Sequence, residues 1–291
     1  MTPWLPTCAK NDTLVVMTVD LTSTPVRSLA TADGRLAYRE AGSGAPLVLL
    51  HGGFVDHRMW EEQIRAFAPG RRVIAWDARG HGASDNATGP FRQVDDLATL
   101  LRGLDAAPAV LVGLCMGGGI AVDCALEYPE LVRAVVVSGV GTSEPVFEDP
   151  WVLGVAAAQQ QALAAGDLAG WADAFVLWAA GPHRDLTGVD PDLVGRLREM
   201  GLGTLGKHTP GEPDHHVPVT RTWERVPGIE VPLIAVNGAL DSPDHLAMAA
   251  RLAELVPDGR TVSIPGAGHY PNMENPARFN AELSAFLDRL P

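Results

Sequence analysis

Three side chains, in one order along the chain, have the chemistry needed for nucleophilic acyl transfer. They are Cys115, Asp241 and His269. A thiolate attacks a carbonyl carbon, a histidine accepts and returns the proton, and a carboxylate orients the histidine and stabilises its positive form. The order nucleophile, acid, base is one in which such triads occur. Each of the three residues then needs a supporting element that holds it in place.

Cys115 lies in a short glycine-rich run from Gly113 to Gly118, after an apolar stretch at 109–112 and before a helix expected over 116–127. This is the strand, turn and helix context of a nucleophile elbow, with sulfur in place of the usual serine oxygen. The flanking glycines suit a strained turn that has no room for neighbouring Cβ atoms. The N-terminal dipole of the helix favours a thiolate. The alternative is a small apolar cysteine packed where a strand meets a helix.

The acid and the base follow two further apolar runs. Residues 233–236 are expected to form a buried strand, and Asp241 comes soon after it. Residues 261–264 are expected to form the next strand, which leads into a Gly- and Pro-rich loop that presents His269. Glu144, just beyond a strand expected over 132–138, is a rival for the acid.

Two more segments give the chain a family resemblance. Leu47-Val48-Leu49-Leu50-His51-Gly52-Gly53-Phe54 looks like a strand followed by an HGG oxyanion loop, and the run from Asp77 to Ser84 looks like a D-x-R-G-x-G-x-S turn. With the elbow, acid and histidine, these segments resemble the α/β-hydrolase fold superfamily, most closely esterases and lactonases of the 3-oxoadipate enol-lactonase type. Cys115 departs from that pattern, as in dienelactone hydrolases and some cysteine-dependent cyclases and thioesterases.

The resemblance implies roles for residues beside the triad. The backbone N-H groups of Phe54 and Met116 would form the oxyanion hole. Gly52 and Gly53 would let the loop approach the substrate closely, and His51 would lie behind the hole as a structural residue. Asp77, Arg79 and Ser84 would tie their own loop together.

Other polar residues have simpler interpretations. His208, Asp214, His215 and His216 lack metal-ligand spacing and are expected in a solvated loop, and Cys124 is expected to be buried and inert. No metal or cofactor is predicted.

Alternating apolar runs and helical stretches predict a mostly parallel sheet with helices on both faces. Strands are expected at 36–40, 47–50, 73–76, 109–112, 132–138, 233–236 and 261–264, and helices at 58–68, 94–104, 116–127, 246–255 and 277–290. The alternation stops over 143–225, which predicts a helical cap inserted between strands six and seven of the superfamily's numbering, here the strands expected at 132–138 and 233–236. The hydrolase core would then be 26–142 and 226–291, preceded by a loosely ordered extension over 1–25.

Composition limits the classes of partner. The chain has 291 residues and a net charge of −13, which argues against nucleic acid as a partner. Three cysteines without CxxC spacing indicate neither a disulfide framework nor a zinc site, and favour a reducing, cytoplasmic setting. No stretch approaches the length of a membrane span, so no membrane partner is expected. The expected partner is a small-molecule acyl substrate, free or bound to a carrier.

The cap and the sulfur indicate the substrate class. Trp151, Trp171, Trp178 and Trp223 fall in the cap segment, which favours an apolar or partly aromatic acyl group. A cysteine forms its thioester readily from an enol ester, lactone or thioester and poorly from an unactivated alkyl ester. Hydrolysis of an activated substrate is the first hypothesis.

Three alternatives stay open at this stage. An acyltransferase or cyclase that releases a carrier-bound thioester would use the same residues, whereas a non-catalytic ligand receptor on this fold would not need the intact acid and histidine. The residues are also compatible with Cys115 as an engineered replacement for serine. Comparing the activity of this chain with that of its Cys115→Ser variant would distinguish a native cysteine from such a replacement.

The first sixteen residues lack an apolar period and precede the first expected strand. We therefore expect a chain that starts at Met17 to keep its fold and its activity. Thermal melting and turnover of the full-length and shortened chains check this. A large drop in the melting temperature would show that the extension is docked on the core.

Overall fold

The computed structural model describes residues 24–290, so Cys8 and Met17 lie outside the described residues. The described strands form one sheet in the order β1-β2-β4-β3-β5-β6-β7-β8. They are β1 Val26–Ala30, β2 Arg35–Ala41, β3 Pro46–Leu50, β4 Arg72–Trp76, β5 Ala109–Leu114, β6 Val132–Ser138, β7 Leu233–Gly238 and β8 Gly259–Ile264. Pairing is antiparallel from β1 to β2 and from β2 to β4, and parallel elsewhere. The expected mostly parallel α/β-hydrolase sheet is confirmed.

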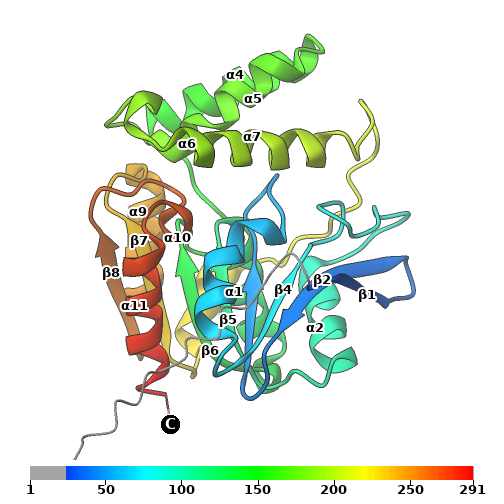
Figure 1. The fold of residues 1–291 in the computed structure, drawn as a ribbon, viewed down its shortest axis with the longest axis vertical. Coiled ribbons are helices and arrows are strands. Elements are labelled where there is room, and N and C mark those ends of the chain that lie inside the picture. The colour runs from blue at the N-terminus through cyan, green and yellow to red at the C-terminus, as the bar shows by residue number, and fades with distance from the viewer. Residues whose placement is uncertain (1–23, 291) are drawn as a thin grey trace, which may run out of the picture.

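The central strands are apolar on both sides because helices cover both faces of the sheet (Figure 1). In β3, Leu47 and Leu49 pack into one core while Val48 and Leu50 pack into the other, as the two-residue period of a strand requires. The first core is completed by α1 (Glu61–Phe67) and α11 (Pro276–Leu287). The second is completed by α2 (Gln93–Gly103), α3 (Met116–Glu127) and α9 (Pro243–Leu255).

Four helices between β6 and β7 form a layer that covers the ends of the strands (Figure 1). They are α4 Pro150–Ala164, α5 Leu168–Phe175, α6 Leu177–Ala180 and α7 Pro191–Leu205. Asp149, Asp167 and Asp190 cap α4, α5 and α7 by accepting hydrogen bonds from first-turn N-H groups. The helix α8 (Thr222–Arg225) and the turn Val226–Gly228 return the chain to the sheet.

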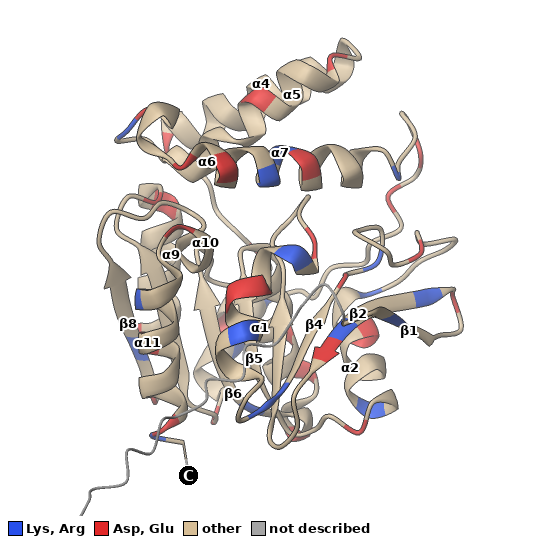
Figure 2. Ribbon diagram, in the orientation of Figure 1, with Lys and Arg blue, Asp and Glu red and all other residues tan. Residues whose placement is uncertain are grey.

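The cap layer has its own buried side chains and charged contacts with the core. Trp171 and Phe175 of α5 stack against each other and are buried, as are Leu197 and Met200 of α7. Charges of both signs lie along α7 (Figure 2). Two ion pairs, Arg196 to Glu61 at 3.2 Å and Arg58 to Glu199 at 2.5 Å, join this helix to the core. These contacts fix where the cap lies above the sheet.

The structure differs from the sequence-based elements at several points, including β1 and the segment 57–68. β1 was not expected, because its five residues lie at the exposed edge of the sheet and carry no buried alternation. The helix expected at 58–68 is a 3₁₀ turn, His57–Trp60, followed by α1. Both differences arise where the hydrophobic pattern of the sequence is weak, so that tertiary contacts determine the backbone conformation.

The close approach of α3 to the end of β3 depends on a glycine at the elbow. A Cβ on Gly117 would lie 2.1 Å from the Leu50 carbonyl oxygen, whereas a Cβ on Gly195 of α7 would meet no atom within 4 Å. We expect Gly117→Ala to lower the free energy of unfolding by about 1–3 kcal/mol, since backbone must move to admit the methyl group. Gly195→Ala, in a helix interior, should be neutral or stabilising by up to about 1 kcal/mol. Urea unfolding of both variants measures this, and equal midpoints would contradict the close approach.

Candidate active site

Cys115 occupies a strained turn between β5 and α3. Its backbone has φ 49° and ψ −115°, in the region that side chains rarely adopt, and its N-H donates to the Ser138 carbonyl at 2.8 Å. It is the N-cap residue of the twelve-residue α3, and its half-buried side chain borders a cavity. The strain is a physical sign of a functional turn. The elbow expected from the sequence therefore has the matching backbone.

Cys124 lies in the same helix but in a different environment. It is fully buried, and burial raises the pKa of its thiol to about 12. A thiol that stays protonated is a poor nucleophile. This agrees with the expectation that Cys124 is inert.

The loops after β7 and β8 bring Asp241 and His269 together. The His269 Nδ1-H donates to Asp241 Oδ2 at 2.8 Å, and both side chains are buried. Gly139, at the end of β6 with φ 61°, supplies the room for this pair, since a Cβ there would lie 2.6 Å from the His269 ring and 2.9 Å from Asp241 Oδ2. Strand ends that neighbour each other in the sheet thus build the acid and base pair.

The charges of the pair are coupled. Burial lowers the pKa of His269, but the Asp241 carboxylate and the hydrogen bond and negative charge of Cys115 outweigh it and raise the pKa to about 10. Burial likewise opposes ionisation of Asp241, yet two histidines hold its pKa below its usual value. At neutral pH the arrangement is an imidazolium between a carboxylate and a sulfur, which stabilises negative charge on that sulfur.

A second histidine, His245, joins the site and was not expected from the sequence. Its Nδ1 lies 3.1 Å from Asp241 Oδ1, and its ring centroid lies 4.4 Å from that of His269. Burial lowers the pKa of His245, with the nearby His269 adding to the effect. The available signal was the spacing of four residues from Asp241, since a helix that begins at Pro243 after the Ser242 cap turns His245 back toward the acid.

The loop after β3 lies beside the elbow. Phe54 has φ 63°, and Met116 is the first residue of α3, where N-H groups have no partner within the helix. A Cβ on Gly52 would lie 3.0 Å from Leu114 and 3.7 Å from the Cys115 Cβ, so Gly52 does allow a close approach. Gly53 borders the cavity beside Cys115, and a Cβ there would meet no protein atom within 4 Å.

Behind this loop, polar side chains fix the backbone. The His51 Nδ1-H donates to the Gly52 carbonyl at 2.7 Å, and its Nε2 accepts from the Ala78 N-H at 2.9 Å. The Asp77 carboxylate accepts from the N-H groups of His57 and Ala83, and the Ser84 hydroxyl donates to the Asp77 carbonyl. These residues support the turn, and none of them borders the cavity beside Cys115.

A cavity of about 220 Å³ opens beside Cys115 and His269. The cap closes it with side chains that are mostly apolar, and Gln159, the polar one among them, accepts from the Trp178 indole N-H at 3.3 Å. The residues contributed by the cap segment are Phe147, Val152, Ala156, Gln159, Phe175 and Trp178. Of the four cap-segment tryptophans, Trp178 alone lines this cavity. Trp223 instead packs among the residues of the second core.

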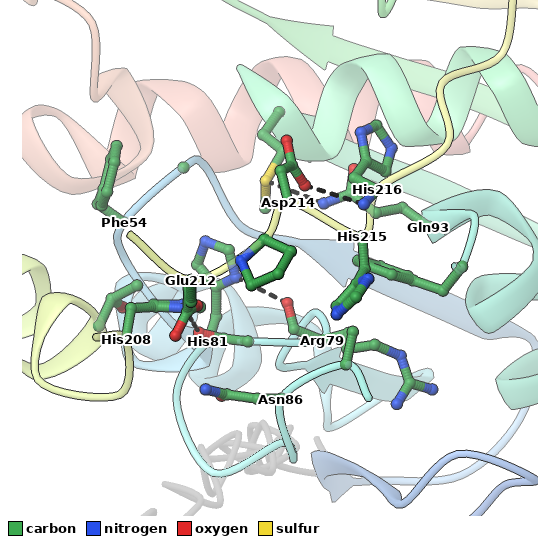
Figure 3. Close-up of a pocket in the computed structure, with 17 residues that line it drawn as sticks. Phe54, Arg79, His81, Asn86, Gln93, His208, Glu212, Asp214, His215 and His216 are labelled. Carbon is green, nitrogen blue, oxygen red and sulfur yellow. Dashed lines mark hydrogen bonds and ion pairs between the residues drawn. The ribbon is translucent and has the colours of Figure 1, made fainter. Parts of the chain in front are cut away.

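A larger cavity of about 640 Å³ adjoins the first at Gly53 and Phe54. Its wall includes polar side chains, among them His208, Asp214, His215 and His216 (Figure 3). These four residues were expected in a solvated loop, and this partly exposed loop also forms a cavity wall. His81 also lines it, and burial lowers the pKa of His81 to about 3, so its ring is uncharged.

Glu144, the rival acid, lies elsewhere. Its carboxylate accepts from the N-H groups of Arg221 and Thr222 and from the Thr222 hydroxyl at 2.7 to 2.9 Å. The hydrogen bonds from Thr222 lead the interactions that lower its pKa. Glu144 therefore joins the two ends of the cap insertion, while Asp241 contacts the histidine.

The cap is tied to the His269 loop by Glu274. Its carboxylate accepts from the Gly268 N-H at 2.7 Å and pairs with Arg184, which also donates to the Ala179 and Gly266 carbonyls. The position of His269 thus depends on cap and core together.

Two groups of described side chains have ligand atoms close enough to hold a metal ion. One is Cys115, His245 and His269, and the other is Asp56, His57 and Asp77. In the second group Asp77 is used by two backbone N-H groups, and Asp56 is paired with Arg58 at 2.8 Å.

Sequence and structure comparisons fit this geometry. The chain matches the α/β hydrolase fold family over residues 45–276. It belongs to that family. Two relatives are "Putative non-heme bromoperoxidase BpoC" of Mycobacterium tuberculosis, 30% identical with 87% of this chain and 97% of that protein covered, and 3-oxoadipate enol-lactonase 2 of Acinetobacter baylyi, 29% identical with 79% and 84% covered. A hydrolase from Pseudomonas aeruginosa superposes with a TM-score of 0.73 at 29% identity, covering 90% of this chain and 98% of that one.

The enol-lactonase relative agrees with the resemblance found in the sequence. Within residues 24–290, no helix has both the length and the apolar character needed to cross a membrane.

The contrast between the two acids gives a direct test. We expect Asp241→Asn to keep the fold and lower kcat by several orders of magnitude, because the imidazole loses the partner that orients it and stabilises its charge. Glu144→Gln should lower kcat far less, since its carboxylate holds only the cap ends. Turnover of an activated ester, with circular dichroism of both variants, measures this. Should Glu144→Gln be the more damaging in a folded protein, the acid would have to be reassigned.

Proposed function

We propose that this α/β hydrolase cleaves an activated ester, lactone or thioester through an acyl-enzyme on Cys115. One observation carries the proposal. Cys115, in a strained turn at the start of α3, lies beside His269, whose Nδ1 is 2.8 Å from the buried Asp241 carboxylate. A merely structural cysteine would need neither the strained backbone nor the charged pair.

The steps follow from these positions. Cys115 Sγ attacks the carbonyl carbon, and the carbonyl oxygen takes the electron pair and is held by the N-H groups of Phe54 and Met116. The tetrahedral intermediate collapses, the bond to the leaving group breaks, and His269 gives that group its proton. A water then loses a proton to His269 and attacks the thioester. The second collapse releases the acid and restores the Cys115 thiolate beside the imidazolium.

The sulfur sets the class of substrate. When the tetrahedral intermediate collapses, a thiolate leaves more easily than an ordinary alkoxide, so an unactivated alkyl ester returns to starting material. An enolate, a strained ring alkoxide or another thiolate leaves well enough to compete. The expected substrate is therefore a small molecule with an activated acyl bond, free or attached to a carrier.

The two cavities suggest how such a molecule binds. The cavity beside Cys115, at about 220 Å³, is smaller than the roughly 300–1,000 Å³ of ordinary ligand pockets and is lined mostly by apolar groups. It suits a short apolar or aromatic acyl group. The adjoining cavity, at about 640 Å³, has polar side chains in its wall and suits the leaving group, and Phe54 lies between the two.

Intact-protein mass spectrometry with a panel of enol esters, lactones and acyl thioesters tests the proposal. We expect an acyl adduct on Cys115, no adduct on Cys115→Ala, which removes the nucleophile, and none after prior alkylation with iodoacetamide. Cys124→Ala serves as the control and should still be acylated, because Cys124 is buried with a raised pKa.

Product analysis separates the fates of the adduct. Free acid shows hydrolysis, and an amide, ester or ring shows that acyl transfer or cyclisation resolves the thioester instead. Binding of the panel without any adduct or turnover would contradict the proposal and favour a ligand receptor.

A further inference from the structure

The site contains one more potential ligand group than acyl transfer needs. Cys115 Sγ and one ring nitrogen from each of His245 and His269 all lie within 4.8 Å of one another. Both histidines are buried, and all three side chains line the same cavity. The described steps of acyl transfer use His269 and leave His245 without a chemical role.

A single carboxylate contacts both imidazoles, and Ser242 Oγ also lies 2.9 Å from His245 Nδ1. Asp241 Oδ2 accepts from His269 Nδ1 at 2.8 Å, and Asp241 Oδ1 lies 3.1 Å from His245 Nδ1. With both Nδ1 atoms engaged in this way, the Nε2 atoms are the ones left to bind a ligand. A carboxylate that holds the Nδ1-H of a metal-binding histidine is the usual outer partner in zinc sites, and here one carboxylate serves two histidines.

The spacing suits a small tetrahedral cation. Zinc binds cysteine sulfur at about 2.3 Å and histidine nitrogen at about 2.0–2.1 Å, which places the ligand atoms roughly 3.3–3.7 Å apart in a tetrahedron. The three groups are at most 4.8 Å apart, and the half-buried Cys115 side chain can close the remainder by rotation. The fourth ligand position faces the cavity, where water or a carboxylate can enter.

We propose that Cys115, His245 and His269 form a Zn²⁺ site with one open position, and that the bound ion blocks acyl transfer. Thiolate and imidazole ligands favour zinc over magnesium or calcium, which take oxygen ligands. Binding replaces the proton shared by Cys115 and His269, which is released to solvent. The ion then occupies the nucleophile and the base together. The binding part is independent of the proposed function, and only the block of turnover rests on it.

Cobalt substitution tests the binding part without an activity measurement. The full-length protein, treated with a chelator and then titrated with Co²⁺, should show a sulfur-to-cobalt charge-transfer band and the d-d bands of a tetrahedral ion at a 1:1 ratio. Zn²⁺ should displace the bands. Isothermal titration calorimetry with Zn²⁺ gives the affinity. Mn²⁺ and Mg²⁺ serve as controls and should compete poorly with Co²⁺ for the site.

Three variants assign the ligands. Cys115→Ser should abolish the charge-transfer band, and His245→Gln should weaken Zn²⁺ binding at least tenfold, with circular dichroism confirming that both are folded. His183→Ala, which removes an exposed histidine outside the cavity, should bind as the unchanged protein does. His269→Gln provides a second test of the ring pair if His245→Gln does not fold.

The outcomes distinguish the two claims. No cobalt band in the unchanged protein, or Zn²⁺ affinity that Cys115→Ser and His245→Gln leave the same, would overturn the site. A Zn²⁺ complex with undiminished turnover would overturn the block while leaving the site. A protein that binds Zn²⁺ through these residues but forms no acyl adduct would overturn the proposed function and leave the Zn²⁺ site standing.

Discussion

The buried carboxylate of Asp241 is the charge around which the site is arranged. Removing a carboxylate from water is costly unless hydrogen bonds and opposite charge compensate it. Asp241 accepts from the Ser242 N-H at 2.7 Å and contacts the Nδ1 atoms of His269 and His245. Ser242 and His245 follow Asp241 in the same segment after β7, whereas His269 comes from the loop after β8. The requirement to satisfy one carboxylate therefore places the base and the second histidine in the site.

The pairing of Asp241 with His269 also depends on residues in the sheet and in the cap. The Asp241 and His269 pair is packed against Gly139, where a side chain would overlap both partners, so the end of β6 must remain bare. The Gly139 N-H in turn donates to Asn237 of β7 at 2.9 Å. Glu274 holds the Gly268 N-H and the cap residue Arg184. A change in the cap can therefore reach His269 through Glu274 without touching the substrate.

Features confined to short stretches of sequence were predictable. Cys115 follows an apolar strand and is flanked by glycines, and His269 stands alone in a Gly- and Pro-rich loop, so local pattern was enough to select both. Gly139 was missed because its importance appears only when the end of β6 meets the loops that carry Asp241 and His269, whereas His245 was missed although its spacing of four residues from Asp241 is local. β1 was missed because an exposed edge strand has no buried period to detect.

The position of the proton shows how one carboxylate can serve two imidazoles. Two positive rings with centroids 4.4 Å apart in a buried site would repel strongly, so at most one carries the charge. Burial acts against charge on both rings, but His269 alone gains the hydrogen bond and negative charge of Cys115, which raises its pKa while that of His245 is lowered. Asp241 raises the pKa of both rings, and Cys115 adds to this effect at His269. The negative charge of Cys115 and the positive charge of His269 stabilise each other, and His245 remains a neutral ring that faces the same cavity.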